Sequence, residues 1–442
     1  MNDLVHNYIS GNSAVKIAHS IESAVRESKI LSGAQLPTVR ALSEWLEVAP
    51  ATVASAYQTL QARGVVVSRG RRGTSVSHRP VPASRRVGAI TCEGRNLRDG
   101  NPDPKLLPGM KAVLRRIDSS HHLYGEPPHD ASLVKIVSRD MKKSGVAVGD
   151  VCVTSGAMDA LERVMTERLK PGDRVIVEDP GFGNTFDLVL AHGLVLVPVP
   201  IDQESFIPSE LARACRDGAQ ALIMTPRAQN PTGAVLSEAR SRELRKILRQ
   251  YPSLLIIEDD HKHIIADAPL NCLHDHRTQQ WVHIRSFSKS LNPDLRMAVM
   301  TGDEETMARV QDRFVVGDRW VSHILQRITA ALLSDKDVRS LLKAAAKTYS
   351  QRRKNLIRAL RCERIDVESS SGFNVWIPVK EETATVQALA AVGWAVSAGE
   401  RFRLSSPPAI RVCTATLSPQ EAKDFASVFA RVVSGGATAC AV

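Results

Sequence analysis

Close cysteine pairs are missing from the sequence, although it has 442 residues and seven cysteines. An odd number of widely spaced cysteines excludes the disulfide framework of a small secreted domain, and no metal-ligand spacing is evident among them. A signal peptide is also missing, because the first residues lack a basic segment followed by an apolar one. We therefore expect a cytoplasmic protein, and we predict no metal site.

Long apolar runs are missing as well. The most apolar stretch, LVLAHGLVLVPVPI, is too short to span a bilayer and contains His192, Gly193 and two prolines. The composition, 43% apolar and 24% charged, is that of an ordinary globular protein, and 442 residues exceed one compact core, so two domains are expected. The formal charge of +11 fits an anionic partner, although the location of the charge matters more than its total.

Residues 1–77 have the pattern of a small helical domain that ends in a hairpin. In AVKIAHSIESAVRES the apolar residues fall on one helical face, and LPTVRALSEWL and APATVASAYQTLQARG continue with helical spacing. VVVSRGRRGTSVS then has two short β-branched runs around a turn of glycines and arginines. Three helices and a basic hairpin predict a winged helix-turn-helix that binds DNA.

This predicted domain offers hydroxyl and guanidinium groups to DNA. The second helix of a helix-turn-helix enters the major groove, while flanking groups hold phosphates. Arginines in the hairpin can neutralise phosphates or enter the minor groove, and glycines let the backbone turn tightly. The alternative is a solvated basic hairpin on a helical bundle, but the charge and the helix order both favour DNA binding. The predicted contact residues are Thr38, Arg40, Thr52, Arg69, Arg71, Arg72 and Gly73.

The motifs LPTVRALSEWLEV, TVASAYQTL and RGRRGTSV resemble the winged-helix head of the GntR family of bacterial repressors and activators. That family often has an arginine at the start of its recognition helix, where this sequence has Pro50. A proline sets the backbone for a helix start but offers no guanidinium to a guanine or a phosphate. Base readout at this position therefore departs from the pattern of the family.

Residues 78–95, HRPVPASRRVGAITCEGR, have no periodicity and are predicted to form a linker. Residues 96–442 contain short β-rich apolar runs that alternate with helical patterns. Such runs suit strands that are buried on both faces of a mainly parallel sheet. We predict a large α/β domain with a small α+β lobe at its C-terminal end, where FNVWIPV and AIRVCTAT occur.

Residues suited to an aldehyde cofactor follow several of these runs. Pyridoxal 5′-phosphate needs a lysine amine for a Schiff base, a carboxylate for its ring nitrogen, and hydroxyls, a cation and a helix N-terminus for its phosphate. Lys289 follows the run VHIRSFS, and LLIIEDD ends in three acidic residues at the sheet edge where ligands collect. The other candidates are Ser155, Gly156, Ala157, Ser286, Ser288 and Arg296 for the phosphate, Asn230 for the ring hydroxyl and Phe182 for stacking on the ring.

Each of these residues alone has an ordinary structural explanation, such as an exposed lysine, a turn or a core aromatic. Together, and in this chain order, they resemble the fold-type I aminotransferases across most of residues 96–442, which we call the predicted body of the chain. A GntR-like head joined to such a body is the architecture of the MocR subfamily of transcriptional regulators. The motifs GNPDP, LYG, TSGAMDALE, TPRAQNPTG, EDDH and RSFSKSLNPDLR are most similar to PtsJ-type members, which regulate vitamin B6 metabolism.

The resemblance implies a role for each matching position. Lys289 would form the Schiff base, Asp259 would partner the ring nitrogen, Tyr124 would reach the phosphate of the neighbouring subunit, and Arg411 would bind a substrate or effector carboxylate. His261 stands where many relatives have a tyrosine that donates to the ring oxygen, and the protonation of an imidazole changes near neutral pH. EPPHDASL replaces the usual glycine-containing loop beside the substrate space. Both departures weigh against efficient transamination, and neither prevents cofactor binding.

Three functions remain open at this point. The chain is a regulator that senses pyridoxal 5′-phosphate, an active aminotransferase with an appended DNA-binding domain, or a DNA-binding protein whose body only dimerises. The head favours the first over the second, because an enzyme gains nothing evident from a basic winged helix. The set of Lys289, Asp259 and Arg296 weighs against the third. A homodimer on paired half-sites is expected, since the fold builds its site from two chains.

Overall fold

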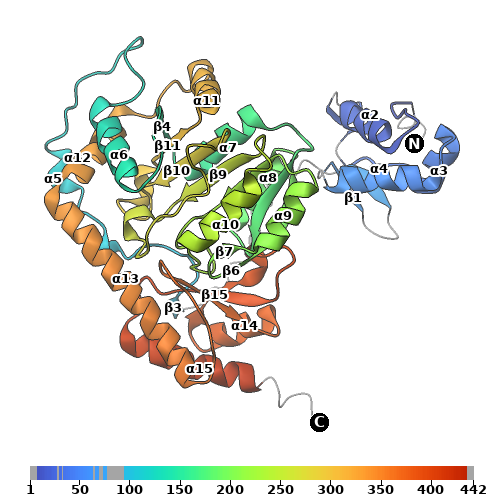
Figure 1. The fold of residues 1–442 in the computed structure, drawn as a ribbon. Helices are drawn as coiled ribbons and strands as arrows, with labels where there is room; N and C mark the ends of the chain where they lie inside the picture. The colour runs from blue at the N-terminus through green and yellow to red at the C-terminus, as the bar shows by residue number, and fades with distance from the viewer. Residues whose placement is uncertain are drawn as a thin grey trace. The chain divides into compact units, whose positions relative to one another are not determined.

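The computed structural model describes residues 7–26, 29–31, 33–62, 65–68, 73–76 and 94–435. The chain folds into two compact units, one built mainly on the N-terminal residues and the other on the residues that follow. We call the described residues up to 76 the head and residues 94–435 the body (Figure 1), and each has a hydrophobic core of its own. The predicted linker lies almost entirely outside the described residues, so its boundaries stay a prediction.

The described part of the head contains three α-helices and a two-stranded antiparallel hairpin, as a winged helix-turn-helix requires. Apolar residues of all three helices and both strands form its core, which includes Ile17, Ile21, Leu42, Val53, Leu60 and Val66. The elements are α2 (Ala14–Arg26), α3 (Val39–Leu46), α4 (Pro50–Ala62), β1 (Val66–Ser68) and β2 (Thr74–Val76).

Local contacts explain where the helices of the head begin. The Thr38 side chain accepts a hydrogen bond from the Ala41 N–H at 3.2 Å and so caps α3. Pro50 is the first residue of α4, where its missing N–H costs nothing because a first-turn N–H has no intrahelical partner. The Tyr57 hydroxyl donates to the Pro37 carbonyl at 2.7 Å, which ties α4 to the segment before α3. The helix order expected from the sequence is therefore present.

The body is built on an eight-stranded sheet in the order β4-β11-β10-β9-β8-β5-β6-β7 within the described residues. Its middle strands, β10, β9, β8 and β5, are parallel neighbours, as their continuous apolar runs predict. The strands are β4 (Val151–Thr154), β5 (Arg174–Asp179), β6 (Val195–Asp202), β7 (Ser205–Phe206), β8 (Ala221–Met224), β9 (Leu255–Asp260), β10 (Trp281–Ser286) and β11 (Ala298–Gly302).

The edges of this sheet depart from the parallel pattern. β11 pairs antiparallel with both β10 and β4, and β7 pairs antiparallel with β6. The segment between β10 and β11 holds only the short 3₁₀ helix η4 (Pro293–Leu295), and it is too short for the crossover that a parallel neighbour requires. The turn after β10, which carries Lys289, is therefore held between two directly hydrogen-bonded strands.

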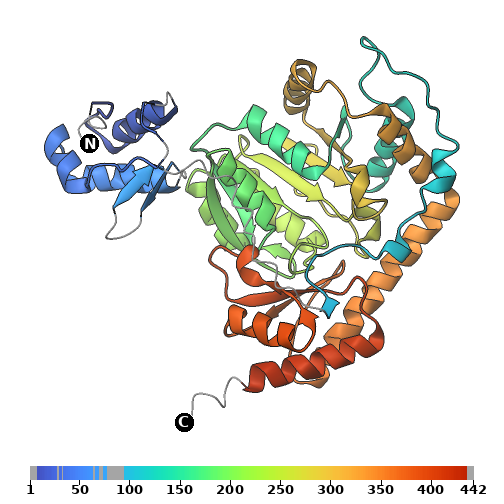
Figure 2. The same cartoon turned by 180° about the vertical axis from the view of Figure 1, so that it is seen from behind.

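Helices of the body flank the sheet and connect it to a C-terminal lobe. The long helix α13 runs past α12 down to α15 in both views (Figures 1 and 2). The helices are α5 (Lys111–Leu114), α6 (Ala131–Lys143), α7 (Ala157–Arg168), α8 (Gly183–Ala191), α9 (Pro208–Arg216), α10 (Glu238–Leu248), α11 (Glu304–Val316), α12 (His323–Ser334) and α13 (Lys336–Cys362), with the 3₁₀ turns η2 (Pro104–Leu106) and η3 (His263–Ile265).

The C-terminal lobe is the predicted α+β part of the body. A separate apolar cluster, which includes Leu356, Val375, Ile410 and Phe425, forms its core. Its central sheet has the order β12-β15-β14, and β13 pairs with β3. Its elements are β3 (Arg95–Asn96), β12 (Asn374–Pro378), α14 (Glu382–Ala391), β13 (Trp394–Ala395), β14 (Ser397–Ala398), η5 (Gly399–Arg401), β15 (Ala409–Cys413) and α15 (Pro419–Gly435).

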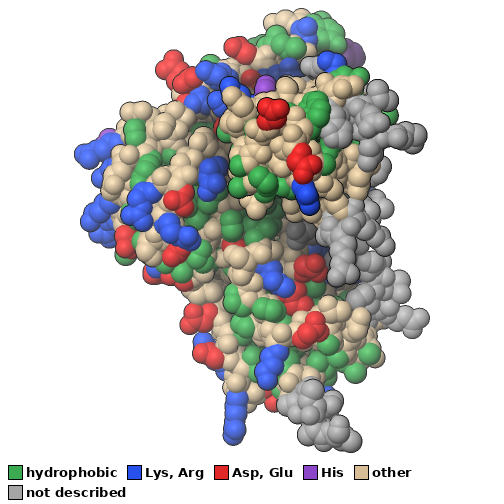
Figure 3. Space-filling model, turned by 90° about the vertical axis from the view of Figure 1, so that its right-hand side faces the viewer, with side chains coloured by type: hydrophobic (Ala, Val, Ile, Leu, Met, Phe, Trp, Pro, Cys, Tyr) green, Lys and Arg blue, Asp and Glu red, His purple; other side chains and the backbone are tan. Residues whose placement is uncertain are grey.

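On the face drawn in Figure 3, Lys and Arg side chains lie among Asp and Glu side chains, so the positive excess does not form one patch there. Among the described residues, no helix combines the length and the apolar character that crossing a membrane requires.

Candidate functional site

The candidate site lies where the strands of the body end, and its central group is Lys289. The Lys289 ammonium donates to the Gly100 carbonyl at 2.9 Å and the side chain is largely buried. Burial lowers the pKa of Lys289, and the nearby cations Arg411 and Arg296 lower it further. A lysine with a lowered pKa presents more of the neutral amine that attacks a carbonyl carbon.

Three consecutive acidic residues end β9, and the structure separates their roles. Asp260 forms a two-point ion pair with Arg227 at 2.9 and 2.8 Å, and Glu258 accepts hydrogen bonds from His274 and from the Leu273 N–H. Asp259 differs, because its buried Oδ1 has no hydrogen-bond partner among the described residues. Side chains alternate along a strand, so Asp259 faces away from its two acidic neighbours.

The environment of Asp259 suits a cationic or proton-donating partner. Burial, and then the charge of Asp260, raise the pKa of Asp259 to about 7. Glu178 lies close by, and burial raises the pKa of its carboxyl to about 8. A buried carboxyl with an unsatisfied oxygen needs a donor, and a protonated pyridine nitrogen is such a donor. The residues present therefore fit the ring of pyridoxal 5′-phosphate.

His261, two residues after Asp259, behaves differently from the sequence-based expectation. Burial, and then the neighbouring charges of Lys262 and Lys289, lower the pKa of His261 to about 3. The imidazole is therefore neutral across the physiological range, whereas the sequence suggested a group that titrates near neutral pH. Because it is neutral, one of its ring nitrogens is a donor and the other an acceptor, and the group can donate to a ring oxygen as a tyrosine does.

The predicted phosphate residues meet at the start of α7. Gly156 precedes this helix with φ of 106°, and a Cβ added there would lie 3.3 Å from Arg296 Nη2. A helix N-terminus beside a guanidinium favours an anion. The Ser155 N–H is already donated to the Asp159 carboxylate at 2.8 Å, so the N–H groups of Gly156 and Ala157 are the ones that remain for a phosphate.

The two predicted serines of the β10 turn also lie at this end of the sheet. Ser286 is the last residue of β10, and its hydroxyl oxygen accepts a hydrogen bond from the Ser288 N–H at 3.3 Å. Lys289 is the next residue, so the turn places two hydroxyls beside the lysine. The role of these two hydroxyls in binding a phosphate stays a prediction.

Asn230 and Arg411 form a second part of the site. Asn230 Oδ1 accepts hydrogen bonds from Asn374 at 3.0 Å and from Arg411 at 3.2 Å, which leaves the Asn230 amide nitrogen as the donor for a ligand. Arg411 also donates to the Arg98 carbonyl, while its buried Nε has no partner among the described residues. The segment around Gly100 therefore contacts both Lys289 and Arg411.

Sequence reasoning missed several residues of this site. Lys262 is a second buried lysine, whose ammonium donates to the Ala228 carbonyl at 3.0 Å and lies 4.6 Å from the Phe373 ring centre. Burial, and then the charge of Lys289, lower the pKa of Lys262 to about 7. Nothing in EDDHKH distinguishes this lysine from an exposed one. Asn374 and Arg98 also lacked a signal, because their partners are distant in the sequence.

For two predicted residues, Phe182 and Tyr124, none of the described hydrogen bonds, ion pairs or ring contacts involves Lys289. Phe182 is half-buried in a segment whose Gly181 N–H donates to the Phe402 carbonyl. Tyr124 is 80% exposed, with its ring 5.4 Å from that of Trp320. The roles of Phe182 in stacking and of Tyr124 in a neighbouring subunit stay predictions.

The predicted DNA contacts of the head are only partly described. Arg40 is exposed and pairs with Glu44 one helical turn away at 3.0 Å, and Thr52 lies in the first turn of α4. Gly73 has φ of 80°, where a side chain would be strained, as its predicted role in the turn requires. The arginines of the wing, Arg69, Arg71 and Arg72, lie outside the described residues.

Thr38 has a structural role that can be separated from DNA binding. Thr38→Ala removes the cap of α3 and is expected to destabilise that helix by about 1 kcal/mol. Hydrogen exchange of the amides of residues 39–46 measures the effect as faster exchange. Thr59→Ala is the control, because the Thr59 hydroxyl only bonds the Ser55 carbonyl within α4 and its loss should leave exchange in α3 unchanged. Equal exchange in wild type and Thr38→Ala would contradict the capping role.

Two family models match the chain, and together they cover most of it. Residues 13–76 match the model described as bacterial regulatory proteins, gntR family. Residues 92–429 match the model described as aminotransferase class I and II. The two matches correspond to the head and the body.

Relatives share both parts of the chain. Over 421 residues the chain is 36% identical to the vitamin B6 salvage pathway transcriptional repressor PtsJ of Salmonella typhimurium, which covers 95% of this chain and 98% of that protein. It is 26% identical over 405 residues to the HTH-type transcriptional regulator TauR of Rhodobacter capsulatus, with 81% of each covered.

Solved structures confirm the predicted fold of the body. A kynurenine aminotransferase of Pyrococcus horikoshii aligns with a TM-score of 0.69 at 19% identity, over 78% of this chain and 92% of that chain. An archaeal alanine:glyoxylate aminotransferase aligns with a TM-score of 0.70 at 21% identity, over 79% and 93%. At such identities the likeness shows the fold alone.

Proposed function

The chain belongs to the MocR subfamily of GntR-type transcriptional regulators. From that premise we propose that it senses pyridoxal 5′-phosphate and that binding of this cofactor changes its affinity for an operator. It is a DNA-binding regulator whose body is a pyridoxal phosphate-binding domain of the aminotransferase class I and II family. The genes that we propose it controls are those of vitamin B6 or amino-compound metabolism, because its 36% identical relative is named for vitamin B6 salvage.

The observation that carries this proposal is the state of Asp259. Its two acidic neighbours are satisfied by cations and N–H groups, while its own buried Oδ1 has no partner among the described residues. A buried carboxyl without a donor is costly, and a ligand with a protonated ring nitrogen relieves the cost. A body kept only for dimerisation would have no need of such a carboxyl together with a lysine of lowered pKa.

The surrounding residues have complementary tasks. When bound, pyridoxal 5′-phosphate supplies an aldehyde that a lysine amine can attack and a ring that withdraws electrons. Lys289 is positioned for that attack by the Gly100 carbonyl. The N-terminus of α7 and Arg296 would hold the phosphate, and the Asn230 amide would donate to the ring hydroxyl, because the Asn230 oxygen already accepts from Arg411.

Arg411 supports the second candidate function, an aminotransferase. A buried arginine in this lobe can bind the carboxylate of an amino acid, but here its η nitrogens already donate to Asn230 and to the Arg98 carbonyl. A substrate would have to displace at least the Arg98 contact. The same guanidinium also fits a second effector that carries a carboxylate.

We further propose a homodimer that places two heads on paired half-sites. Within the described residues, exposed large apolar side chains gather in two segments of the body, and they include Leu114, Leu123, Tyr124, Val315, Val316 and Ile324. Apolar groups exposed to this extent favour a protein partner, and a two-fold dimer matches the symmetry of a palindromic operator. Such a regulator acts where the bacterial chromosome lies, in the cytoplasm.

The wing arginines are expected to bind phosphates. Replacing Arg71 and Arg72 with alanine should weaken operator binding and make the slope of log affinity against log salt shallower by about 2 per head, since each lost phosphate contact contributes about 0.9. Fluorescence anisotropy at several salt concentrations measures this slope. Replacing Arg361, in the last turn of α13, and Arg364, just after this helix, is the matched control, because both are exposed, and should leave the slope unchanged. An unaltered slope in the variant that lacks Arg71 and Arg72 would show that the wing does not contact DNA phosphates.

A footprint on the chain's own upstream DNA tests the proposed function. We expect two protected half-sites and a change in their protection when pyridoxal 5′-phosphate is added. A parallel assay follows the conversion of amino acids to keto acids. If the protection is the same with and without the cofactor, and each chain converts many amino acid molecules, the chain is an aminotransferase and the proposed function is wrong.

A further inference from the structure

A cluster of four side chains of the types that bind metal ions lies on the side of β9 opposite to Asp259. Glu258 from β9 and His283 from β10 are direct partners in the parallel pairing of the two strands. Cys272 and His274 come from the segment that follows η3, between these strands. One potential ligand atom from each of the four residues lies within 4.8 Å of those from the others.

Hydrogen bonds within this cluster leave most of its imidazole nitrogens unsatisfied. His274 Nδ1 contacts Glu258 Oε2, but His274 Nε2 and both ring nitrogens of His283 are buried and have no hydrogen-bond partner among the described residues. His283 Nδ1 lies 3.7 Å from the same carboxylate oxygen, beyond hydrogen-bond length. His283 is fully buried, and burying two unpaired ring nitrogens is costly unless a ligand binds them.

We propose that Glu258, Cys272, His274 and His283 bind one Zn²⁺ ion. A thiolate, two imidazoles and a carboxylate are the donors that zinc takes in tetrahedral sites, with bonds of about 2.0–2.3 Å. Such bonds place neighbouring donor atoms about 3.5 Å from one another. Because the four candidate atoms lie within 4.8 Å of one another, small side-chain shifts would bring them around the ion, and Glu258 and His274 would move slightly apart. Four protein ligands fill the coordination shell, which is typical of a structural rather than a catalytic site.

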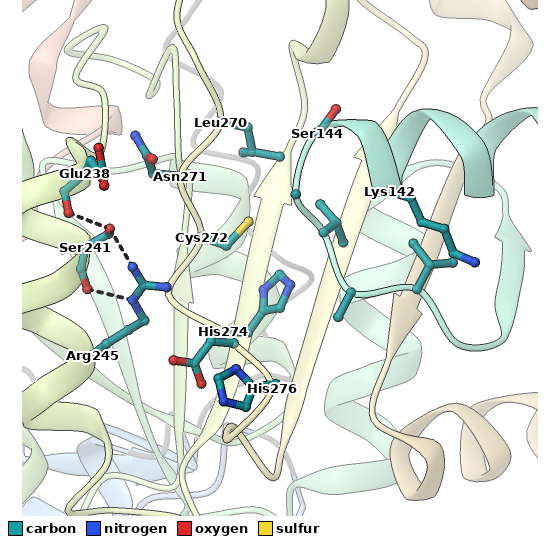
Figure 4. A pocket seen from close by; sticks show the side chains of 15 residues that line it. Lys142, Ser144, Glu238, Ser241, Arg245, Leu270, Asn271, Cys272, His274 and His276 are labelled. Atoms are coloured by element: carbon teal, nitrogen blue, oxygen red, sulfur yellow. Dashed lines mark hydrogen bonds between the residues drawn. The ribbon is translucent and has the colours of Figure 1, made fainter.

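The surroundings of the cluster allow an ion to reach it. Cys272 and His274 line a pocket of about 700 Å³ together with the turn after α6 and the first turns of α10 (Figure 4). Cys272 is partly buried, whereas Glu258, His274 and His283 are buried. The site is separate from the cofactor site, because Glu258 and Asp259 point to opposite faces of β9.

The metal would join three parts of the body that the sequence separates. It would tie the end of β9 to β10 and to the segment that contains Cys272 and His274. The ligands occur between residues 258 and 283 without a repeated Cys or His spacing, which explains why the sequence predicted no metal site. Strand pairing is what brings Glu258 and His283 together.

Zinc binding is tested on the full-length chain after treatment with a chelator. Competition of added Zn²⁺ with a chromophoric chelator should give one tightly bound ion per chain, and Co²⁺ in its place should show a thiolate-to-metal charge-transfer band. Cys272→Ser should abolish the band. Glu258→Gln removes a ligand and should weaken Zn²⁺ binding at least as much as the roughly 10- to 100-fold that loss of an outer-shell partner costs. Cys362→Ser, at an exposed cysteine of α13, and His276→Gln, in the same segment as His274, are matched controls that should bind normally.

The absence of saturable uptake by the wild-type chain would overturn the proposal, and so would normal uptake and an unchanged band in Cys272→Ser. If the variants fail to fold, alkylation of the wild-type chain decides the question. Zn²⁺ should then protect Cys272 at least tenfold relative to Cys362, because a bound thiolate is a poor nucleophile. Equal labelling of both cysteines with and without Zn²⁺ would exclude Cys272 as a ligand.

Discussion

Lys289→Ala is expected to abolish the covalent retention of pyridoxal 5′-phosphate. Borohydride reduction of the wild-type chain should fix about one cofactor per chain on the peptide that contains Lys289, and the variant should retain none. The lowered pKa of Lys289 and its contact with the Gly100 carbonyl prepare this one amine for the aldehyde. The overall affinity of the variant for pyridoxal 5′-phosphate, measured without reduction, should be lower than that of the wild type on the order of 100-fold, or about 2.7 kcal/mol.

The chain offers a demanding control for this experiment in Lys262. Lys262 is also buried and its pKa is also lowered. Like Lys289, it lowers the pKa of His261. Its ammonium, however, donates to the Ala228 carbonyl beneath the Phe373 ring. Lys262→Met should keep normal trapping on Lys289. Trapping that survives Lys289→Ala and disappears in Lys262→Met would reassign the reactive amine.

Asp259→Asn is expected to change cofactor binding and stability in opposite directions. Loss of the carboxylate removes the partner of the ring nitrogen, and affinity for pyridoxal 5′-phosphate should fall by 10- to 100-fold, or about 1.4–2.7 kcal/mol. The cofactor-free variant should nevertheless be more stable than the wild type at pH 8, because an amide is neutral and the buried carboxylate is not. Spectroscopic titration measures the first effect and denaturant unfolding the second.

The sign of the stability effect follows from the direction of the pKa shift. The pKa of Asp259 is raised from 3.8 to about 7, so the folded chain holds this proton more tightly than the unfolded chain. Its contribution to stability is complete below about pH 4 and is lost as the pH rises through 7. The advantage of Asp259→Asn should therefore grow from pH 5 to pH 8 and reach roughly 2–4 kcal/mol, with the shift itself setting the upper limit.

Asp260→Asn is the matched control and should have the opposite effect. Asp260 is paired with Arg227, which holds the pKa of this carboxyl far below its usual range despite burial. Removing one partner of a buried pair costs about 3–5 kcal/mol. A cofactor-free Asp259→Asn chain that is less stable than the wild type at pH 8 would contradict the assignment of Asp259 as an unsatisfied, ligand-binding carboxyl.

Much of the fold could be predicted because apolar runs and turn residues are local signals. RVIVED and LLIIEDD form buried strands where expected, and the Thr38 cap and Pro50 start the helices of the head. The antiparallel direction of β11 could not be predicted. It depends on the short connection to β10 and on pairing with β4, which is distant in the sequence. The prediction of the fold class is confirmed.

The candidate site could be predicted only where a motif carried it. Lys289 and Asn230 lie in recognisable turns, but the distinction among the three acidic residues of β9 depends on partners far away in the sequence, such as Arg227 and His274. The low pKa of His261 arises from burial and from neighbouring lysines, which no local pattern reveals. Long-range packing therefore decides the electrostatics of the site.

The central claim is that cofactor binding and operator binding are energetically coupled. It is tested most directly by titrating a labelled operator from the chain's own upstream region with and without saturating pyridoxal 5′-phosphate. The affinity of the wild-type chain should change at least about fivefold, as coupling of 1–3 kcal/mol gives, and the difference should vanish in Lys289→Ala. An identical operator affinity in both conditions, with the cofactor bound, would contradict the claim.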